Sequence, residues 1–171
     1  MIQRRALSGD ELFHLRRVAI HEAGHAQIAA IYGVTGEIRI FPVLERSSQF
    51  QFSGIFLPDS VLPDSEANRQ YGLAGVAAEG IDGGFENVVH ILAAKTMSPP
   101  DIKLAGEFEP RHVMETIGLL KWHWGEIEVR ATAAMEPWLR GPMNLSNDAA
   151  SPTNESLAQG HSATPQHKDS P

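Results

Sequence analysis

The chain has 171 residues, of which 42% are hydrophobic, and a formal net charge of −7. This length suits one domain with a substantial core, and the acidic balance argues against nucleic acids or anionic membranes as main partners. The sequence contains no cysteine, which excludes disulfides and thiolate metal sites, so a bound metal needs His, Asp or Glu ligands.

The longest apolar stretches fall well short of the roughly 20 residues that span a bilayer. Near the N-terminus, basic residues are not followed by an apolar run, so the start of the chain does not read as a signal peptide. We therefore expect no membrane segment and a cytoplasmic location.

A long helix is the first predicted element. Ser8 and Glu11 form a capping-box pattern, apolar residues then recur at helical spacing, and Gly33 is a natural stop. Two strands are expected next, over residues 37–43 and 49–57, the second because two phenylalanines alternate with polar residues. Together they predict a small sheet.

Helices are expected in the rest of the folded part. A helix rich in Gly and Ala, able to pack closely against another element, opens at Pro63–Glu66 and ends before Gly83. Three more are predicted: one over 85–97, one that begins at Ser98, and a long one from Pro110 to about Trp138. The expected fold is therefore mainly α with a small β-sheet, in the α+β class.

The chain changes character near its C-terminus. From Asn144 to Pro171 there is no aromatic residue, Val or Ile, and Ser, Asn, Pro, Gln and Ala dominate. Such a composition cannot bury enough apolar surface to fold. We expect one domain over residues 1–143 and a disordered tail over 144–171.

The first predicted helix carries the sequence HEAGH, an HExxH motif at His21, Glu22 and His25. Residues four apart lie on one helix face, about 6 Å from each other, so both imidazoles can reach one ion. Glu22 lies one step around the helix, where it can accept a proton from a water that the metal activates. Gly24 costs about 1 kcal/mol relative to Ala inside a helix, which indicates close approach by another element. The alternative is a pair of partly buried, hydrogen-bonded histidines.

Four segments resemble those of the FtsH-type ATP-dependent metalloproteases. The run VAIHEAGHAQIAAIYG is similar to the zinc-binding helix of that family. FSGIFLP is similar to its strand beside the active site, GLAGVAAEGI to its small-residue helix, and SPPDIKLA to its segment with an Asp before an amphipathic helix. The resemblance covers roughly residues 12–138 and implies a zincin-like metallopeptidase fold.

Carried over residue by residue, the resemblance implies that His21, His25 and Asp101 bind Zn²⁺ and that Glu22 is the catalytic base. It implies that Glu79 lies near the histidines, where a carboxylate can orient an imidazole. The chain also departs from the family. It has no GxxxxGK[ST] phosphate loop and no membrane anchor, Val76 and Gly80 replace a basic and an acidic residue, and two prolines precede Asp101.

The residues themselves leave the third ligand open. Asp101 is preferred, although an acid at the third position of a Ser98-capped helix is also a common helix-start device. Glu79 is the alternative ligand, in a thermolysin-like arrangement. Among the histidines, His90 lies in an apolar stretch typical of a core residue, His112 and His123 are weaker candidates, and His14 is expected to line the cleft without touching the ion.

The leading hypothesis is a zinc metalloendopeptidase that hydrolyses peptides or unfolded proteins without ATP. Its substrate backbone would pair with the strand that contains Phe52, Ser53, Gly54 and Ile55, as an exposed sheet edge allows. The rival is a catalytically weak or inactive binding or regulatory protein that retains the metal. His and carboxylate ligands also accept iron or manganese, and both a monomer and a homo-oligomer remain open.

Overall fold

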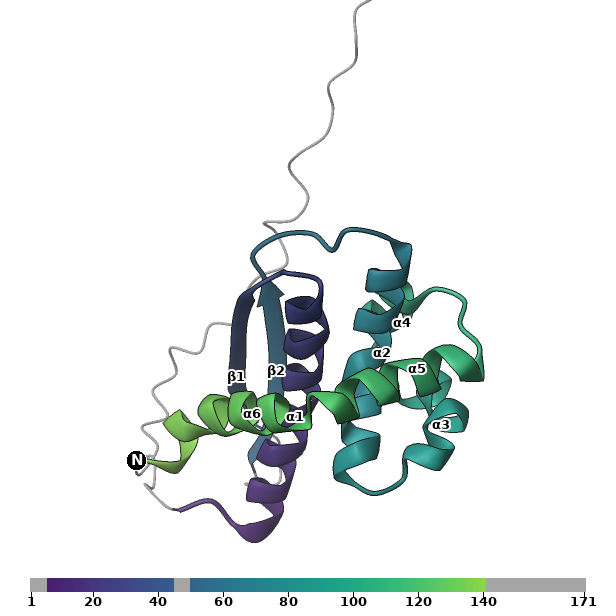
Figure 1. Ribbon diagram of the computed structural model, residues 1–171. Coiled ribbons are helices and arrows are strands. Elements are labelled where there is room, and N and C mark those ends of the chain that lie inside the picture. The colour runs from purple at the N-terminus through teal and green to yellow at the C-terminus, as the bar shows by residue number, and fades with distance from the viewer. Residues whose placement is uncertain (1–5, 45–49, 141–171) are drawn as a thin grey trace, which may run out of the picture.

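The computed structural model describes residues 6–44 and 50–140. This part of the chain is mainly helical, with one two-stranded antiparallel sheet, so the predicted α+β class is confirmed. Figure 1 shows the elements in the order α1 (Gly9–Ile31), β1 (Gly36–Leu44), β2 (Phe50–Pro58), α2 (Ser65–Asp82), η1 (Glu86–Val88), α3 (Val89–Thr96), α4 (Pro99–Ala105), α5 (Pro110–Trp122) and α6 (Trp124–Leu139).

Helix α1 begins where the capping box predicts. The Ser8 hydroxyl accepts a hydrogen bond from the Glu11 backbone N–H, and the Glu11 carboxylate accepts one from the Ser8 N–H at 2.7 Å. The helix ends at Ile31, and Gly33 follows with φ of 75°. Glycine tolerates this left-handed conformation without a Cβ clash, so the chain can turn directly into β1.

The two strands form the hairpin that the sequence predicts, with small differences in length. Gly36 lies opposite Pro58 and Leu44 opposite Phe50, so each strand extends one residue beyond its expected end. The expected start of the second strand at Gln49 lies outside the described residues. The side chain of Phe56 is buried in the core, its ring centroid 6.2 Å from that of Tyr71, and β2 packs along the helix that carries the HExxH motif.

Helix α2 packs against α1, which lies between the hairpin and α2 (Figure 1). The Asp64 side chain accepts from the Ala67 N–H and caps α2, and Gly83 ends it as predicted. A Cβ at Gly24 would lie 2.7 Å from the Ala74 carbonyl oxygen. The close approach that Gly24 predicts is therefore the contact between α1 and α2.

Two helix predictions need correction. The helix expected over 85–97 ends as expected, with Met97 as its C-cap, but it starts only at Val89, after a 3₁₀ turn, and no side chain caps either N-terminus. The long helix expected from Pro110 to Trp138 breaks at His123 into α5 and α6. The break allows α5 to pack on α2 while α6 crosses α1 (Figure 1), which one straight helix could not do.

No helix in the described ranges, 6–44 and 50–140, is both long and apolar enough to cross a bilayer. The predicted tail over 144–171 lies outside these ranges, so its expected disorder stays a prediction.

Candidate metal centre

Three side chains of α1, four residues apart, face α2: Arg17, His21 and His25. The two helices run antiparallel, so residues later in α1 meet residues earlier in α2. Arg17 pairs with Glu79, and the His25 ring contacts Tyr71, their centroids 4.7 Å apart. Between these pairs, a Cβ at Gly75 would overlap the His21 imidazole, including Cδ2 at 2.6 Å. The helical period therefore places the HExxH histidines against a position of α2 that has no side chain.

A second row of α1 faces β2. The Phe52 N–H donates to His14 Nδ1 at 3.0 Å. A Cβ at Gly54 would lie 2.8 Å from Val18 Cγ1 and 2.6 Å from Glu22 Cγ. Successive members of this row are one turn apart, about 6 Å, which nearly equals the advance of two residues along a strand. Helix and strand therefore run side by side, with Glu22 directly beneath Gly54.

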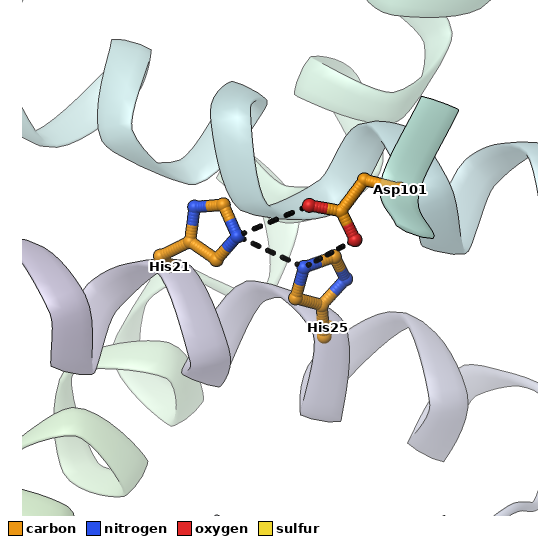
Figure 2. A group of neighbouring side chains, drawn as sticks. All are labelled: His21, His25 and Asp101. Atoms are coloured by element: carbon orange, nitrogen blue, oxygen red, sulfur yellow. Dashed lines mark hydrogen bonds and ion pairs between the residues drawn. The ribbon is translucent and has the colours of Figure 1, made fainter. Parts of the chain in front are cut away.

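Three potential metal ligands meet at one point (Figure 2). His21 Nε2 and His25 Nε2 lie 3.1 Å apart. Each lies 3.5 Å from an oxygen of Asp101, which comes from α4. Within the described part of the chain, only this set of His, Asp and Glu side chains forms such a group. The structure thus brings together the three residues expected to bind the metal.

The hydrogen bonds of the Nδ1 atoms of His21 and His25 determine which ring nitrogens are left to bind a metal. His21 Nδ1 lies 2.7 Å from Glu79 Oε1, and His25 Nδ1 lies 2.8 Å from the Tyr71 carbonyl oxygen. Carboxylate and carbonyl oxygens only accept hydrogen bonds, so both Nδ1 atoms carry hydrogen in the neutral imidazoles. Both Nε2 lone pairs then point at each other and at Asp101.

This arrangement fits a divalent cation. Two lone pairs and a carboxylate repel one another at these distances unless a positive charge lies among them. A tetrahedral ion about 2.0–2.1 Å from each ligand sets neighbouring ligand atoms about 3.3–3.4 Å apart, close to the 3.1–3.5 Å found for this set. His and carboxylate ligands suit Zn²⁺ and also iron or manganese. The donor set and its spacing therefore agree with the expected metal.

Without a metal, the cluster holds a proton instead. Burial lowers the pKa of His21, but Asp101 and Glu79 raise it by more, to about 10. Burial and the neighbouring His21 charge lower the pKa of His25 to about 4. The carboxylates Asp101 and Glu79 thus stabilise a positive charge at the buried site, and in the metal-free protein a proton on His21 provides this charge.

Asp101 satisfies both interpretations that the sequence left open. Ser98 caps α4, and its hydroxyl accepts from the Asp101 backbone N–H. The same hydroxyl lies 2.8 Å from Asp101 Oδ2 and donates to it. The helix start that explains an acid here without a metal also fixes the carboxylate beside the two histidines.

Glu79 lies on the outer side of the site. Its Oε1 accepts from His21 Nδ1, away from the Nε2 atoms, and its Oε2 accepts from Arg17 Nε at 2.5 Å. Burial raises the pKa of Glu79, but hydrogen bonds and charges from His21 and Arg17 lower it by more. Glu79 therefore lies where a carboxylate can orient an imidazole, and its Oε1 contacts the side of His21 away from the Nε2 atoms and Asp101.

Glu22 lies beside the cluster in a cleft of about 620 Å³ between β2, α1 and α4. Burial raises the pKa of its carboxyl group, whereas His21 and a backbone hydrogen bond with Phe56 lower it, and the net shift is upward. All residues proposed to bind substrate line this cleft, namely Phe52, Ser53, Gly54 and Ile55. His14 lines it too, as expected.

The remaining candidate histidines lie outside the group. His112 Nδ1 accepts from the Glu109 N–H at the start of α5, and His90 lies on α3. His123 occupies the break between α5 and α6, beside Trp122, which is 85% exposed.

Sequence reasoning missed the roles of Gly75 and of the Tyr71 carbonyl. The four-residue spacing of Tyr71, Gly75 and Glu79 is the signal that could have revealed them.

No protein-family model matches the chain, and no curated protein matches it.

Proposed function

We propose that this chain is a zinc metallopeptidase with a zincin-like fold, similar to the peptidase domain of FtsH-type proteases, which hydrolyses peptides or unfolded chains. The observation that carries the proposal is the meeting of His21 Nε2, His25 Nε2 and the Asp101 carboxylate within 3.1–3.5 Å. Two histidines and a carboxylate leave one position of a tetrahedral ion open, as catalytic zinc sites require. A purely structural site needs a fourth protein ligand and has no use for a neighbouring base.

In this proposal Glu22 moves the proton. When bound, zinc supplies Lewis acidity, which lowers the pKa of a water molecule to about 7 and polarises the peptide carbonyl. Glu22 accepts a proton from water as the water oxygen bonds to the carbonyl carbon. It then gives this proton to the peptide nitrogen as the C–N bond breaks. The products are a carboxylic acid, which then loses its proton at neutral pH, and an amine.

The other residues of the site hold the reacting groups. Glu79 and the Tyr71 carbonyl orient the two imidazoles through Nδ1, a support that metal-ligating histidines commonly have. The strand β2 lies along the cleft above Glu22, and its backbone can pair with an extended peptide. None of these steps uses a nucleotide, so we expect this chain to hydrolyse unfolded substrates without added ATP.

Metal content tests the site. We would purify the wild type, Asp101→Ala and Glu79→Ala without added metal or chelator and measure bound metals by mass spectrometry. The exposed Asp59, which accepts from the Thr35 hydroxyl, provides the control variant Asp59→Ala. We expect about one zinc per chain in the wild type and in Asp59→Ala, and none in Asp101→Ala. Glu79→Ala should bind zinc more weakly, but it should still take up about one zinc per chain when zinc is afterwards added in excess, which Asp101→Ala should not.

Three results would change the conclusion. Loss of zinc only in Glu79→Ala would move the ligand set to the thermolysin-like alternative. Iron or manganese in place of zinc would indicate a different metal hydrolase. A wild type that binds no metal, even when zinc is offered, would refute the enzyme proposal.

Glu22→Gln tests catalysis separately from metal binding. The variant should keep its zinc and lose hydrolysis of an unfolded protein or peptide by about 10²- to 10⁴-fold, the contribution typical of general acid–base catalysis. A wild type that binds zinc and hydrolyses nothing across a broad peptide library would favour the binding or regulatory alternative.

A further inference from the structure

Two polar side chains of α1 line one end of the cleft, His14 on the side of β2 and Arg17 on the side of α2. His14 and Arg17 are about one helical turn apart, and both line the cleft. Arg17 is the only Lys or Arg among the described residues that line it, and its neighbour Arg16 pairs with Asp82 outside the cleft. This end of the cleft therefore has the guanidinium group of Arg17, whose Nε is paired with Glu79.

His14 occupies the edge of β2 at Phe52. Because His14 Nδ1 accepts the Phe52 N–H at 3.0 Å, the imidazole is neutral and carries its hydrogen on Nε2. No described residue accepts from that Nε2–H. The Phe52 ring also contacts Trp138 of α6, with their centroids 5.5 Å apart. The strand edge is thus closed to a substrate backbone at this point, and a hydrogen-bond donor of His14 is left without a partner beside it.

The backbone pattern of β2 limits how far a peptide can pair with it. The Phe52 N–H donates to His14, and Phe56 makes a backbone hydrogen bond to Glu22. Alternate residues of a strand direct their backbone groups to the same side. Of residues 52, 54 and 56, whose backbone groups point to this side, Gly54 alone makes no such hydrogen bond with a described residue. A chain that pairs here must end or turn away near His14.

Arg17 has further donors that are not used within the fold. Its Nε donates to Glu79 at 2.5 Å, and its side chain remains 56% exposed. The other guanidinium nitrogens make no hydrogen bond with any described residue. Arginine binds carboxylates through two parallel N–H groups, so these nitrogens, together with His14 Nε2–H, suit one carboxylate.

We propose that Arg17 and His14 bind a carboxylate of the substrate at this end of the cleft, so that the preferred substrates are short peptides whose free C-terminus lies there. Antiparallel pairing, the commoner arrangement of strands, directs the C-terminal side of a peptide on β2 toward Phe52 and His14. This inference rests on the proposed function, because it assigns the substrate class of the same cleft. An acidic side chain offers the same chemistry as a terminal carboxylate, and the experiment separates them.

Peptide binding to zinc-loaded Glu22→Gln, which should not turn over, tests the subsite without requiring activity. We would compare three N-terminally fluorescein-labelled hexapeptides of one apolar sequence by fluorescence anisotropy: the free acid, the amide, and an amide with Glu in the last position. The free acid should bind about 10- to 100-fold more tightly than the apolar amide, the range that a charged hydrogen bond supplies. Tight binding of the Glu-containing amide alone would keep the carboxylate subsite and assign it to an acidic side chain.

Variants in the Glu22→Gln background locate the subsite. Adding Arg17→Gln or His14→Phe should remove most of the preference for the carboxylate, whereas adding Arg16→Gln should preserve it. Zinc content, measured on every variant, shows whether a loss reflects the metal site instead. Equal binding of the free acid and the apolar amide, or a preference that survives both substitutions, would overturn the inference.

Activity then separates this inference from the proposed function. Hydrolysis by the wild type that ignores the carboxylate would refute the subsite and leave the peptidase. Carboxylate-dependent binding by a protein that hydrolyses no peptide would refute the peptidase and leave the subsite.

Discussion

The absence of a side chain at Gly75 is what admits His21 to the metal site. A Cβ at this position would overlap Nε2 and Cε1 of the imidazole and would lie 2.6 Å from Cδ2. In Gly75→Ala the ring must therefore rotate away from Glu79 and Asp101. Because the loss of a residue that merely orients a ligand costs about 10- to 100-fold in metal affinity, displacement of the ligand itself should cost at least as much.

The effect of Gly75→Ala on stability combines two opposing contributions. Alanine favours a helix interior by about 1 kcal/mol relative to glycine, while overpacking a close contact costs about 1–3 kcal/mol. The metal-free variant should therefore lie between no change and a loss of about 2 kcal/mol. Gly118→Ala on α5 is the matched control, because a Cβ there meets nothing within 4 Å, and it should gain up to about 1 kcal/mol.

Competition with a chromophoric chelator measures zinc affinity, and urea unfolding of the metal-free proteins measures stability. Of the two variants, only Gly75→Ala should bind zinc weakly. Its free energy of unfolding should be about 1–3 kcal/mol lower than that of Gly118→Ala. Gly75→Ala with wild-type zinc affinity would refute the assignment of His21 as a ligand held against α2.

Three further predictions concern the support of the site. Glu79→Gln should weaken zinc binding by about 10- to 100-fold in a chelator competition, whereas Glu86→Gln, which alters an exposed pair with Lys121, should leave it unchanged. Metal-free His21 has a pKa of about 10, and a histidine that binds zinc must be neutral. Zinc binding at pH 7.5 should therefore release about one proton, and the zinc affinity should rise about tenfold per pH unit up to pH 9. Calorimetry in buffers of different ionisation enthalpy measures the number of protons released, and a value of zero would contradict this prediction. Ser8→Ala removes the cap of α1 and should lower the free energy of unfolding by about 1 kcal/mol, without changing the zinc content.

Local patterns in the sequence determine the ends of several elements and the histidine pair. The capping residues Ser8, Asp64 and Ser98 each start a helix because their side chains bind backbone N–H groups only three residues away. The spacing of His21 and His25 places both imidazoles on one side of α1 for the same reason, since the helical period alone fixes their relation.

Only the tertiary structure decides the remaining parts of the site. Asp101 and Glu79 are both acids on helices, and the sequence cannot tell which of them meets Nε2 and which meets Nδ1. That choice depends on how α2 and α4 pack around α1. The break at His123 also depends on tertiary packing. The sequence of α5 and α6 has the pattern of one continuous helix, but in the structure α5 packs on α2 and α6 packs on α1. Contacts between residues distant in sequence leave no local pattern, so they emerge only when the chain is folded.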